Sequence, residues 1–183
     1  MRMKKLDCIA TIEISSHQIQ VAREFALKVI ETVDYADSNQ SNKDKIAEDH
    51  FISKIGEEAV KTCYENLGFA VSAIDYTIYN GKDKSWESDI FINNYPLAVK
   101  TQKVSSAIKY GLSWTFQSSE FRNDPILQNP DAWVCFVECD DSHNFSCRVF
   151  PPIQIKSLTF RAPQLPHLLG KKKVVYAKDF VHL

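Results

Sequence analysis

The stretch SWESDIFINNYPLAVKTQ, residues 85–102, decides the expected fold. Within it, two short apolar runs, 89–92 and 96–100, flank Asn93-Asn94-Tyr95. Asparagines between β-prone segments are a turn signal, because Asn tolerates the left-handed backbone that tight turns require. The sequence therefore predicts a β-hairpin whose two arms lie side by side.

The hairpin brings two groups of opposite charge within reach of each other. Asp89 stands at the start of the first arm and Lys100 at the end of the second. Side chains alternate along a strand, so Ala98, Lys100 and Gln102 are expected on one face. A carboxylate and an ammonium among apolar neighbours are the groups that a metal-dependent phosphodiesterase site needs.

Length and composition predict one globular domain. The chain has 183 residues, 44% hydrophobic and 25% charged, which suits a single folded domain with a substantial core. We expect an N-terminal helix and loop over residues 1–45, a core over 46–150 and a C-terminal extension over 151–183. The formal net charge of −1 argues against non-specific coating of nucleic acid, although a local basic groove remains compatible with it.

Compartment signals predict a cytoplasmic protein without a membrane partner. No run of 18 apolar residues is present, and the N-terminal residues are too polar for a signal peptide. An odd number of cysteines without a secretion signal indicates free thiols in a reducing compartment. The five are Cys8, Cys63, Cys135, Cys139 and Cys147.

Apolar periodicity predicts a mixed α/β fold, with a mixed sheet flanked by helices. A first helix is expected from Ser15 or Ser16 to about Val33, and a second from about Ile46 to Asn66, ended by Gly68. Besides the hairpin, the predicted elements are strands at 69–79, 133–138, 145–150 and 174–176, a short helix at 103–112 and a loop at 117–130.

Hydrolysis of a phosphodiester bond explains why these residue types matter together. A divalent metal polarises the phosphoryl oxygen and lowers the pKa of the attacking water. Magnesium prefers oxygen ligands and keeps several waters, so Asp89 and the backbone carbonyl of Val99 are natural ligands. Lys100 is the natural group to stabilise negative charge on the phosphate.

These residues resemble the motif of the PD-(D/E)XK nuclease superfamily, which includes restriction endonucleases and Mrr-like enzymes. Asp89 and Lys100 fall on the first and last motif positions. The family often adds a glutamate on the preceding helix, and Gly56-Glu57-Glu58 is similar to that arrangement, with Glu57 the closer match and Glu58 the substitute. The resemblance covers residues 48–102 of the chain.

The resemblance implies a restriction-endonuclease-like fold and an Mg²⁺-dependent, or Mn²⁺-dependent, DNA endonuclease. In that implication Asp89 and Glu57 bind or orient the metal, Lys100 stabilises charge, and Gln102 is a second-rank catalytic candidate. DNA is the implied partner, and a homodimer is implied because such enzymes often cut two strands. The chain has no P-loop and no GxGxxG, so no nucleotide cofactor is expected.

One position departs from the motif. Ala98 stands two residues before Lys100, where the family usually carries an acidic residue or glutamine, and alanine cannot bind metal. Glu57, Glu58, Glu120 or Gln102 could substitute in space. The alternative is a catalytically inactive DNA-binding or partner-binding protein on the same scaffold, and a third possibility is an RNA-directed nuclease.

Other charged and aromatic residues have two readings. Glu57 and Glu58 could be a solvated helix face that pairs with lysines. The lysine clusters, at 171–173 and at 82 and 84, could be solvated surface or phosphate contacts. Three aromatic residues could pack in the core or stack on bases: Trp114, Phe116 and Phe121.

Three cysteines and one histidine in the C-terminal half of the chain have a regular spacing that suggests a zinc site. Cys135, Cys139, His143 and Cys147 recur at intervals of four. Strand residues four apart are about 13 Å apart along the chain, which is too far for one tetrahedral ion. The cysteines are therefore better interpreted as core thiols.

Overall fold

The chain forms a mixed β-sheet in the computed structural model, which describes residues 6–32, 42–79, 88–142 and 145–180. The sheet has six strands in the order β1-β6-β5-β3-β2, and β7 pairs with β5 beside that path. β3 and β5 run parallel, whereas β2 and β3 are antiparallel. The strands are β1 (Ala10–Glu13), β2 (Ile90–Ile92), β3 (Tyr95–Lys103), β5 (Trp133–Cys139), β6 (Ser146–Val149) and β7 (Ile153–Gln154).

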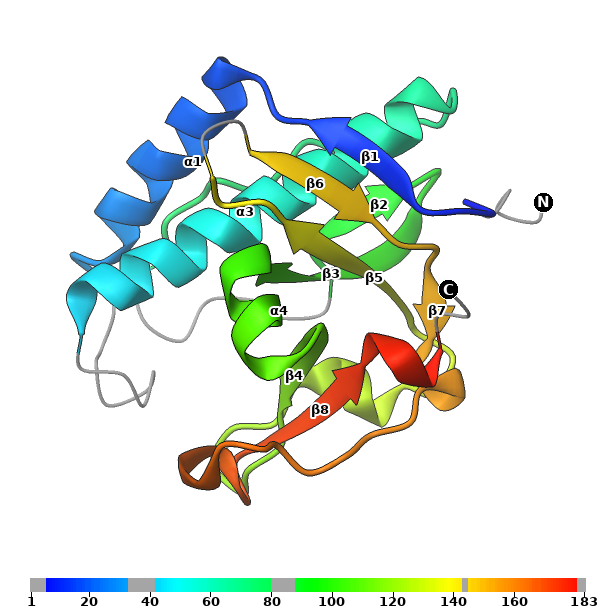
Figure 1. Cartoon of the computed structure of the whole chain (residues 1–183). Helices are drawn as coiled ribbons and strands as arrows, with labels where there is room; N and C mark the ends of the chain where they lie inside the picture. The colour runs from blue at the N-terminus through cyan, green and yellow to red at the C-terminus, as the bar shows by residue number, and fades with distance from the viewer. Residues whose placement is uncertain (1–5, 33–41, 80–87, 143–144, 181–183) are drawn as a thin grey trace.

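Two helices cover one face of this sheet. They are α1 (Ser16–Val29) and α3 (Lys43–Asn66), which lie next to each other on the same side (Figure 1). Their apolar faces share one core cluster with β3 and β5, which includes Ile55, Val99 and Val137. This arrangement confirms the mixed α/β class that the sequence predicts.

Local sequence signals explain where the two helices begin. The Ser15 hydroxyl accepts a hydrogen bond from the Gln18 N–H at 3.3 Å, and Gln18 Oε1 accepts one from the Ser15 N–H at 2.9 Å. This reciprocal pair is a capping box. The Asn42 side chain accepts a hydrogen bond from the Lys45 N–H, so α3 begins at Lys43, earlier than predicted.

Helix α3 approaches strand β3 unusually closely at one glycine. A Cβ atom added to Gly56 would lie 1.8 Å from Thr101 Oγ1 and 2.9 Å from Thr101 Cβ. Only hydrogen fits in that space, so Gly56 allows the helix to lie directly on the strand. The contact fixes α3 against the segment of β3 that carries Lys100 and Gln102.

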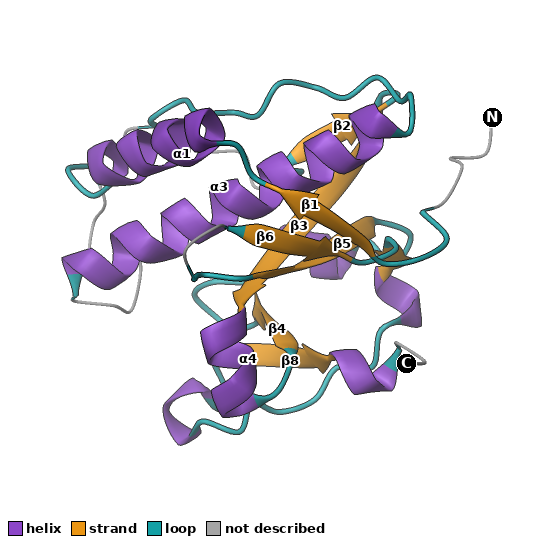
Figure 2. Ribbon diagram, turned by 45° about the horizontal axis from the view of Figure 1, so that its top comes forward, coloured by secondary structure: helices purple, strands orange, loops and turns teal. Residues whose placement is uncertain are grey.

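A second layer lies on the opposite face of the sheet. β4 (Ser113–Gln117) and β8 (Lys172–Tyr176) form a two-stranded antiparallel sheet, separated from α1 and α3 by the main sheet (Figure 2). Trp114 and Phe116 are buried there with Phe136 and Phe150, which assigns these two aromatic residues to the core. The other helices in the described ranges are α4 (Val104–Tyr110) and four 3₁₀ turns at Pro125–Gln128, Ile155–Ser157, Pro166–Leu168 and Ala177–Asp179.

Two predicted elements differ from the structure. The expected strand at 69–79 is wrong, since only Val71 forms a bridge, to Ile92. Asp75 accepts hydrogen bonds from the Thr77 N–H and the Tyr79 hydroxyl, so these groups bond locally and not to a neighbouring strand. The predicted loop at 117–130 contains the last residue of β4 and a 3₁₀ turn.

The remaining global features are simple. No helix in the described ranges is long and apolar enough to span a membrane. All five cysteines are free thiols, and only Cys8 is exposed. Lys82, Lys84 and His143 lie outside the described residues.

Candidate functional site

The hairpin places Asp89 and Lys100 on the same face of the sheet. Asn93 and Asn94 form its two-residue turn with φ of 47° and 67°, which is the conformation that tight β-hairpins require. The pairing of Ile90 with Leu97 continues to Asp89, whose N–H donates to the Leu97 carbonyl at 3.2 Å. Asp89 therefore lies opposite Ala98, and Lys100 follows on that face of β3.

One cleft of about 530 Å³ collects most of the predicted site residues. Asp89, Lys100, Glu57 and Gln102 all line it, and so do Ala98 and Val99. Its walls come from α3, from β3 and from the segment that follows β4. The polar and charged residues that also line the cleft include Asp49, Lys54, Lys103, Gln117, Arg122, Asn123, Asp124 and Lys172.

Asp89 is fixed at the edge of strand β3 by a backbone contact. The Val99 N–H donates to Asp89 Oδ2 at 2.7 Å. The N–H and C=O of one strand residue point to the same side, so the Val99 carbonyl is also directed toward the Asp89 side of β3. A carboxylate and a backbone carbonyl thus converge on one edge of the strand.

Lys100 makes a close contact that the sequence does not predict. Its Nζ lies 2.6 Å from Asp124 Oδ2, and it also lies 5.0 Å from the centre of the Phe116 ring. Asp124 belongs to the segment after β4, and Ile126, two residues on, packs in the same cluster as Ala98. Asp124 therefore brings a carboxylate to the face on which Ala98 has none.

Glu57 is buried and paired rather than solvated. Its carboxylate lies 2.7 Å from Lys54 Nζ, and only 2% of Glu57 is exposed. Lys54 Nζ also lies 5.2 Å from the ring centre of Phe25 and 5.7 Å from that of Tyr76. The expected pairing of Glu57 with a lysine is confirmed, but the solvated face is wrong, because α1 and the sheet enclose this part of α3 and bury both glutamates.

Glu58 points to a different part of the structure. It accepts hydrogen bonds from Gln18 Nε2 and from the Tyr76 hydroxyl, each at 2.9 Å. Burial, followed by the neighbouring Glu58 charge, raises the pKa of Tyr76, so this hydroxyl keeps its proton. Glu58 is not among the residues that line the cleft.

Gln102 connects β3 to the start of β4. Its Oε1 accepts a hydrogen bond from the Ser113 N–H at 2.8 Å, and its Nε2 donates to the Gly111 carbonyl at 3.3 Å. Gly111 has φ of +81°, which glycine adopts without strain. Gln102 therefore orders the turn after α4 while lining the cleft. Of the other suggested substitutes for Ala98, Glu120 lies on an exposed loop.

Two charged residues enter the cleft from distant parts of the chain. Burial raises the pKa of Asp49, although the charges of Lys45 and Lys172 act in the opposite direction. Burial lowers the pKa of Lys172, and the positive charges of Arg122 and Lys100 add to that effect. Lys172 belongs to the lysine cluster at 171–173 that the sequence offers as possible phosphate contacts, whereas no local motif distinguishes Asp49.

The donor atoms fit a magnesium ion that keeps most of its water. Such an ion is usually held by one or two carboxylates and completed by substrate phosphate. Asp89 supplies a carboxylate and Val99 a carbonyl on the same side of β3. Across the ranges that the structure covers, no three His, Cys, Asp or Glu side chains are grouped so that they could hold a metal.

Comparison with protein family models, with curated proteins and with solved structures finds no match to this chain.

Proposed function

We propose that this protein is a divalent-metal-dependent endonuclease that hydrolyses phosphodiester bonds of DNA. One observation carries the proposal: Asp89 and Lys100 share a face of two adjacent strands and line one cleft. Had they lain on opposite faces, one metal-and-phosphate pocket could not have used both. Their placement supports the chemistry that the motif suggests.

Each residue has a defined role in this proposal. A bound Mg²⁺ or Mn²⁺ would polarise the phosphate and activate water. Asp89 and the Val99 carbonyl hold that ion, and the Lys100 ammonium stabilises negative charge on the phosphate. The ion pair of Glu57 with Lys54 holds helix α3, which forms one wall of the cleft. Gln102 accepts a hydrogen bond from the Ser113 N–H and so holds the end of β3 next to Lys100.

The topology is consistent with the restriction-endonuclease-like fold that we propose for the chain. The helix α3 precedes the β2–β3 hairpin, and α4 lies between the parallel strands β3 and β5. The parallel strands β3 and β5 are buried between the layer of α1 and α3 on one face and the layer of β4 and β8 on the other. The proposed active site therefore lies at β3, where the β2–β3 hairpin meets the part of the sheet that α3 covers.

The charges in the cleft favour a phosphate ligand. Five of its lining residues are cationic, namely Lys54, Lys100, Lys103, Arg122 and Lys172. Four are acidic, namely Asp49, Glu57, Asp89 and Asp124. The whole chain is slightly acidic, so positive charge is concentrated here relative to the rest of the molecule. The excess among these nine residues is one positive charge, and Lys54, Lys100 and Lys103 already pair with Glu57, Asp124 and Glu48, so charge alone gives a polyanion only modest attraction.

A second candidate is a nucleic-acid-binding protein on the same scaffold that does not cut. Ala98 favours it, because the motif's second acidic ligand is missing from β3. The contact of Lys100 with Asp124 also favours it, since the lysine already has an anionic partner. In this case the cleft would bind phosphate and release it unchanged.

Cleavage assays separate the two candidates. Supercoiled and linear DNA are incubated with the protein and Mg²⁺ or Mn²⁺, beside Asp89→Asn, Lys100→Ala and the surface control Lys156→Ala. The endonuclease proposal predicts nicked or linear product from the unmodified protein and the control only. Tight binding without product in either metal supports the second candidate, and cleavage of RNA but not DNA moves the substrate to RNA.

A further inference from the structure

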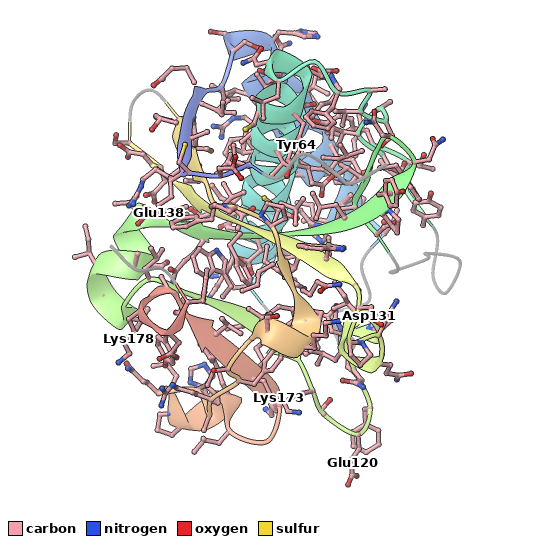
Figure 3. The ribbon with its side chains drawn as sticks, turned by 90° about the vertical axis from the view of Figure 1, so that its right-hand side faces the viewer. Tyr64, Glu120, Asp131, Glu138, Lys173 and Lys178 are labelled. Carbon is pink, nitrogen blue, oxygen red and sulfur yellow. The ribbon has the colours of Figure 1, made fainter. Side chains whose placement is uncertain are left out.

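The segment after β4 presents one aromatic side chain to solvent. Phe121 is 99% exposed, whereas Trp114 and Phe116 in the preceding strand are buried. Phe121 lies on the loop 118–124. The preceding residue, Glu120, projects away from the body of the molecule (Figure 3). A single exposed apolar side chain is common on protein surfaces, so any role for Phe121 has to be argued from its surroundings.

The loop that carries Phe121 is held in a defined shape. Ser118 and Asn123 form a β-bridge, and the Ser119 N–H donates to the Arg122 carbonyl at 3.0 Å. The Ser119 hydroxyl accepts a hydrogen bond from the Arg122 N–H, also at 3.0 Å. The Phe121 backbone is therefore held at the end of a hydrogen-bonded turn.

The base of the same loop is a wall of the candidate active site. Arg122, Asn123 and Asp124 line the cleft, and Asp124 contacts Lys100. Phe121 therefore stands on the rim of the cleft, one residue from a cation that faces into it. Phe121 itself does not line the cleft, but it precedes Arg122 in the chain, and Arg122 does.

Lysines flank the loop on its other side. The Ser118 N–H donates to the Lys171 carbonyl at 2.9 Å, and β8 continues beside β4 with Lys172 and Lys173. Lys171 and Lys173 are exposed, and Lys172 lines the cleft. The lysine cluster that is ambiguous in the sequence thus lies beside the base of this loop, at Ser118, and reaches the cleft through Lys172.

An aromatic side chain within a cationic surface matches the requirements of a single nucleic-acid strand. Stacking on a base needs one exposed aromatic face, and phosphates need nearby cations. A protein partner would need a continuous apolar patch. The neighbours of Phe121 in the loop are instead polar or charged: Ser118, Ser119, Glu120, Arg122 and Asn123.

We propose that Phe121 stacks on an unpaired base while Arg122, Lys171 and Lys173 contact the adjoining phosphates. The preferred substrate is then a single-stranded or locally unpaired segment of nucleic acid, delivered to the cleft past this rim. A fully paired duplex offers no free base face except at its ends. This inference rests on the proposed function, since it names the substrate class for the same cleft.

Binding measured without metal tests the inference separately from cleavage. Single-stranded DNA carrying 2-aminopurine and a hairpin-closed duplex are titrated in EDTA, with anisotropy for affinity and 2-aminopurine fluorescence for stacking. Phe121→Ala is expected to weaken single-strand binding roughly 5- to 150-fold and to restore the quenched fluorescence. Phe121→Trp should retain both, and duplex binding should change little in either variant.

Ile108→Ala is the matched control, because Ile108 is 83% exposed and lies on α4 away from the loop. Equal single-strand affinity in Phe121→Ala and the unmodified protein overturns the inference, and so does an equal loss on single strand and duplex. A stacking effect without any cleavage overturns the endonuclease proposal and leaves the stacking site. If cleavage requires Asp89 but neither cleavage nor binding changes in Phe121→Ala, the endonuclease proposal stands and the stacking inference is overturned.

Discussion

Lys54 and Glu57 form a buried ion pair of 2.7 Å on helix α3, three residues apart and enclosed between α1 and the sheet. Buried ions are costly to desolvate, so each depends on the other for compensation. The pair lies on the helix that carries Gly56 and forms one wall of the cleft. Its geometry therefore affects both stability and the site.

Breaking this pair from one side should be strongly destabilising. We expect Glu57→Ala to lower the free energy of unfolding by about 3–5 kcal/mol, because Lys54 is left buried without its anion. The double variant Lys54→Met/Glu57→Leu should recover most of that loss. Urea unfolding followed by circular dichroism measures both. Lys61 and Glu65, an exposed pair on the same helix, provide the control, and Glu65→Ala should cost less than about 1 kcal/mol.

Gly56 should tolerate no side chain. Alanine is the better helix former by about 1 kcal/mol, yet Gly56→Ala should destabilise the protein, because its Cβ would overlap Thr101 Oγ1. Overpacking of this kind costs about 1–3 kcal/mol or more. Thr101→Ala should rescue only part of the loss, since the Thr101 Cβ also lies within 2.9 Å. A stabilised Gly56→Ala protein would show that the helix does not lie against β3 as described.

The Asp124 carboxylate should weaken the binding of phosphate, because it forms an ion pair with the Lys100 ammonium that a phosphate has to replace. Asp124→Asn keeps the size of the side chain and removes its charge, so we expect DNA to bind roughly twofold to fivefold more tightly at low salt. Lys100→Ala should weaken binding. Anisotropy titrations in EDTA check both, and the exposed Asp131, paired with Lys156, supplies the charge-matched control Asp131→Asn. Weaker binding by Asp124→Asn than by that control would mean that Asp124 supports the ligand instead of competing with it.

Partial shielding of the Asp49 carboxylate from solvent predicts a small pH-dependent stability difference, small because the residue as a whole is exposed. Its folded pKa is raised above the ordinary 3.8, chiefly by burial, with Glu48 adding to the effect and Lys45, Lys172 and Lys103 opposing it. The folded state therefore binds this proton more tightly, and that contribution to stability is lost as the pH rises through the folded pKa.

Replacing Asp49 with an uncharged amide tests the sign of this effect. Asp49→Asn should gain stability relative to the unmodified protein as the pH rises from about 4 to 8. Urea unfolding at several pH values measures the difference between the two proteins. A difference that is flat, or that falls as the pH rises, would contradict the assignment.

Locally encoded elements could be predicted from the sequence. The Asn93-Asn94 turn, the alternation along β3 and the capping box at Ser15 each act within a few residues. These signals predicted the hairpin, both long helices and the shared face of Asp89 and Lys100. They wrongly predicted a strand at 69–79, where Asp75 forms local side-chain hydrogen bonds and strand pairing is limited to one bridge at Val71.

Non-local contacts could not be predicted. The approach of Asp124 to Lys100, and of Lys172 to the cleft, depends on the pairing of β4 with β8, which are far apart in the chain. Burial of Glu57 depends on how α1 packs on α3, and helix periodicity alone placed it equally well on a solvated face. The exposure of Phe121 beside two buried aromatic residues likewise follows from the fold and not from residue type.

Diffraction from crystals grown with Mn²⁺ and a cleavage-resistant phosphorothioate oligonucleotide tests the central claim most directly. We predict an anomalous manganese peak bonded to a carboxylate oxygen of Asp89 and the carbonyl oxygen of Val99, with Lys100 Nζ moved from Asp124 to a phosphate oxygen. A bound oligonucleotide without manganese at Asp89, and with Lys100 still joined to Asp124, would contradict a shared metal-and-phosphate site.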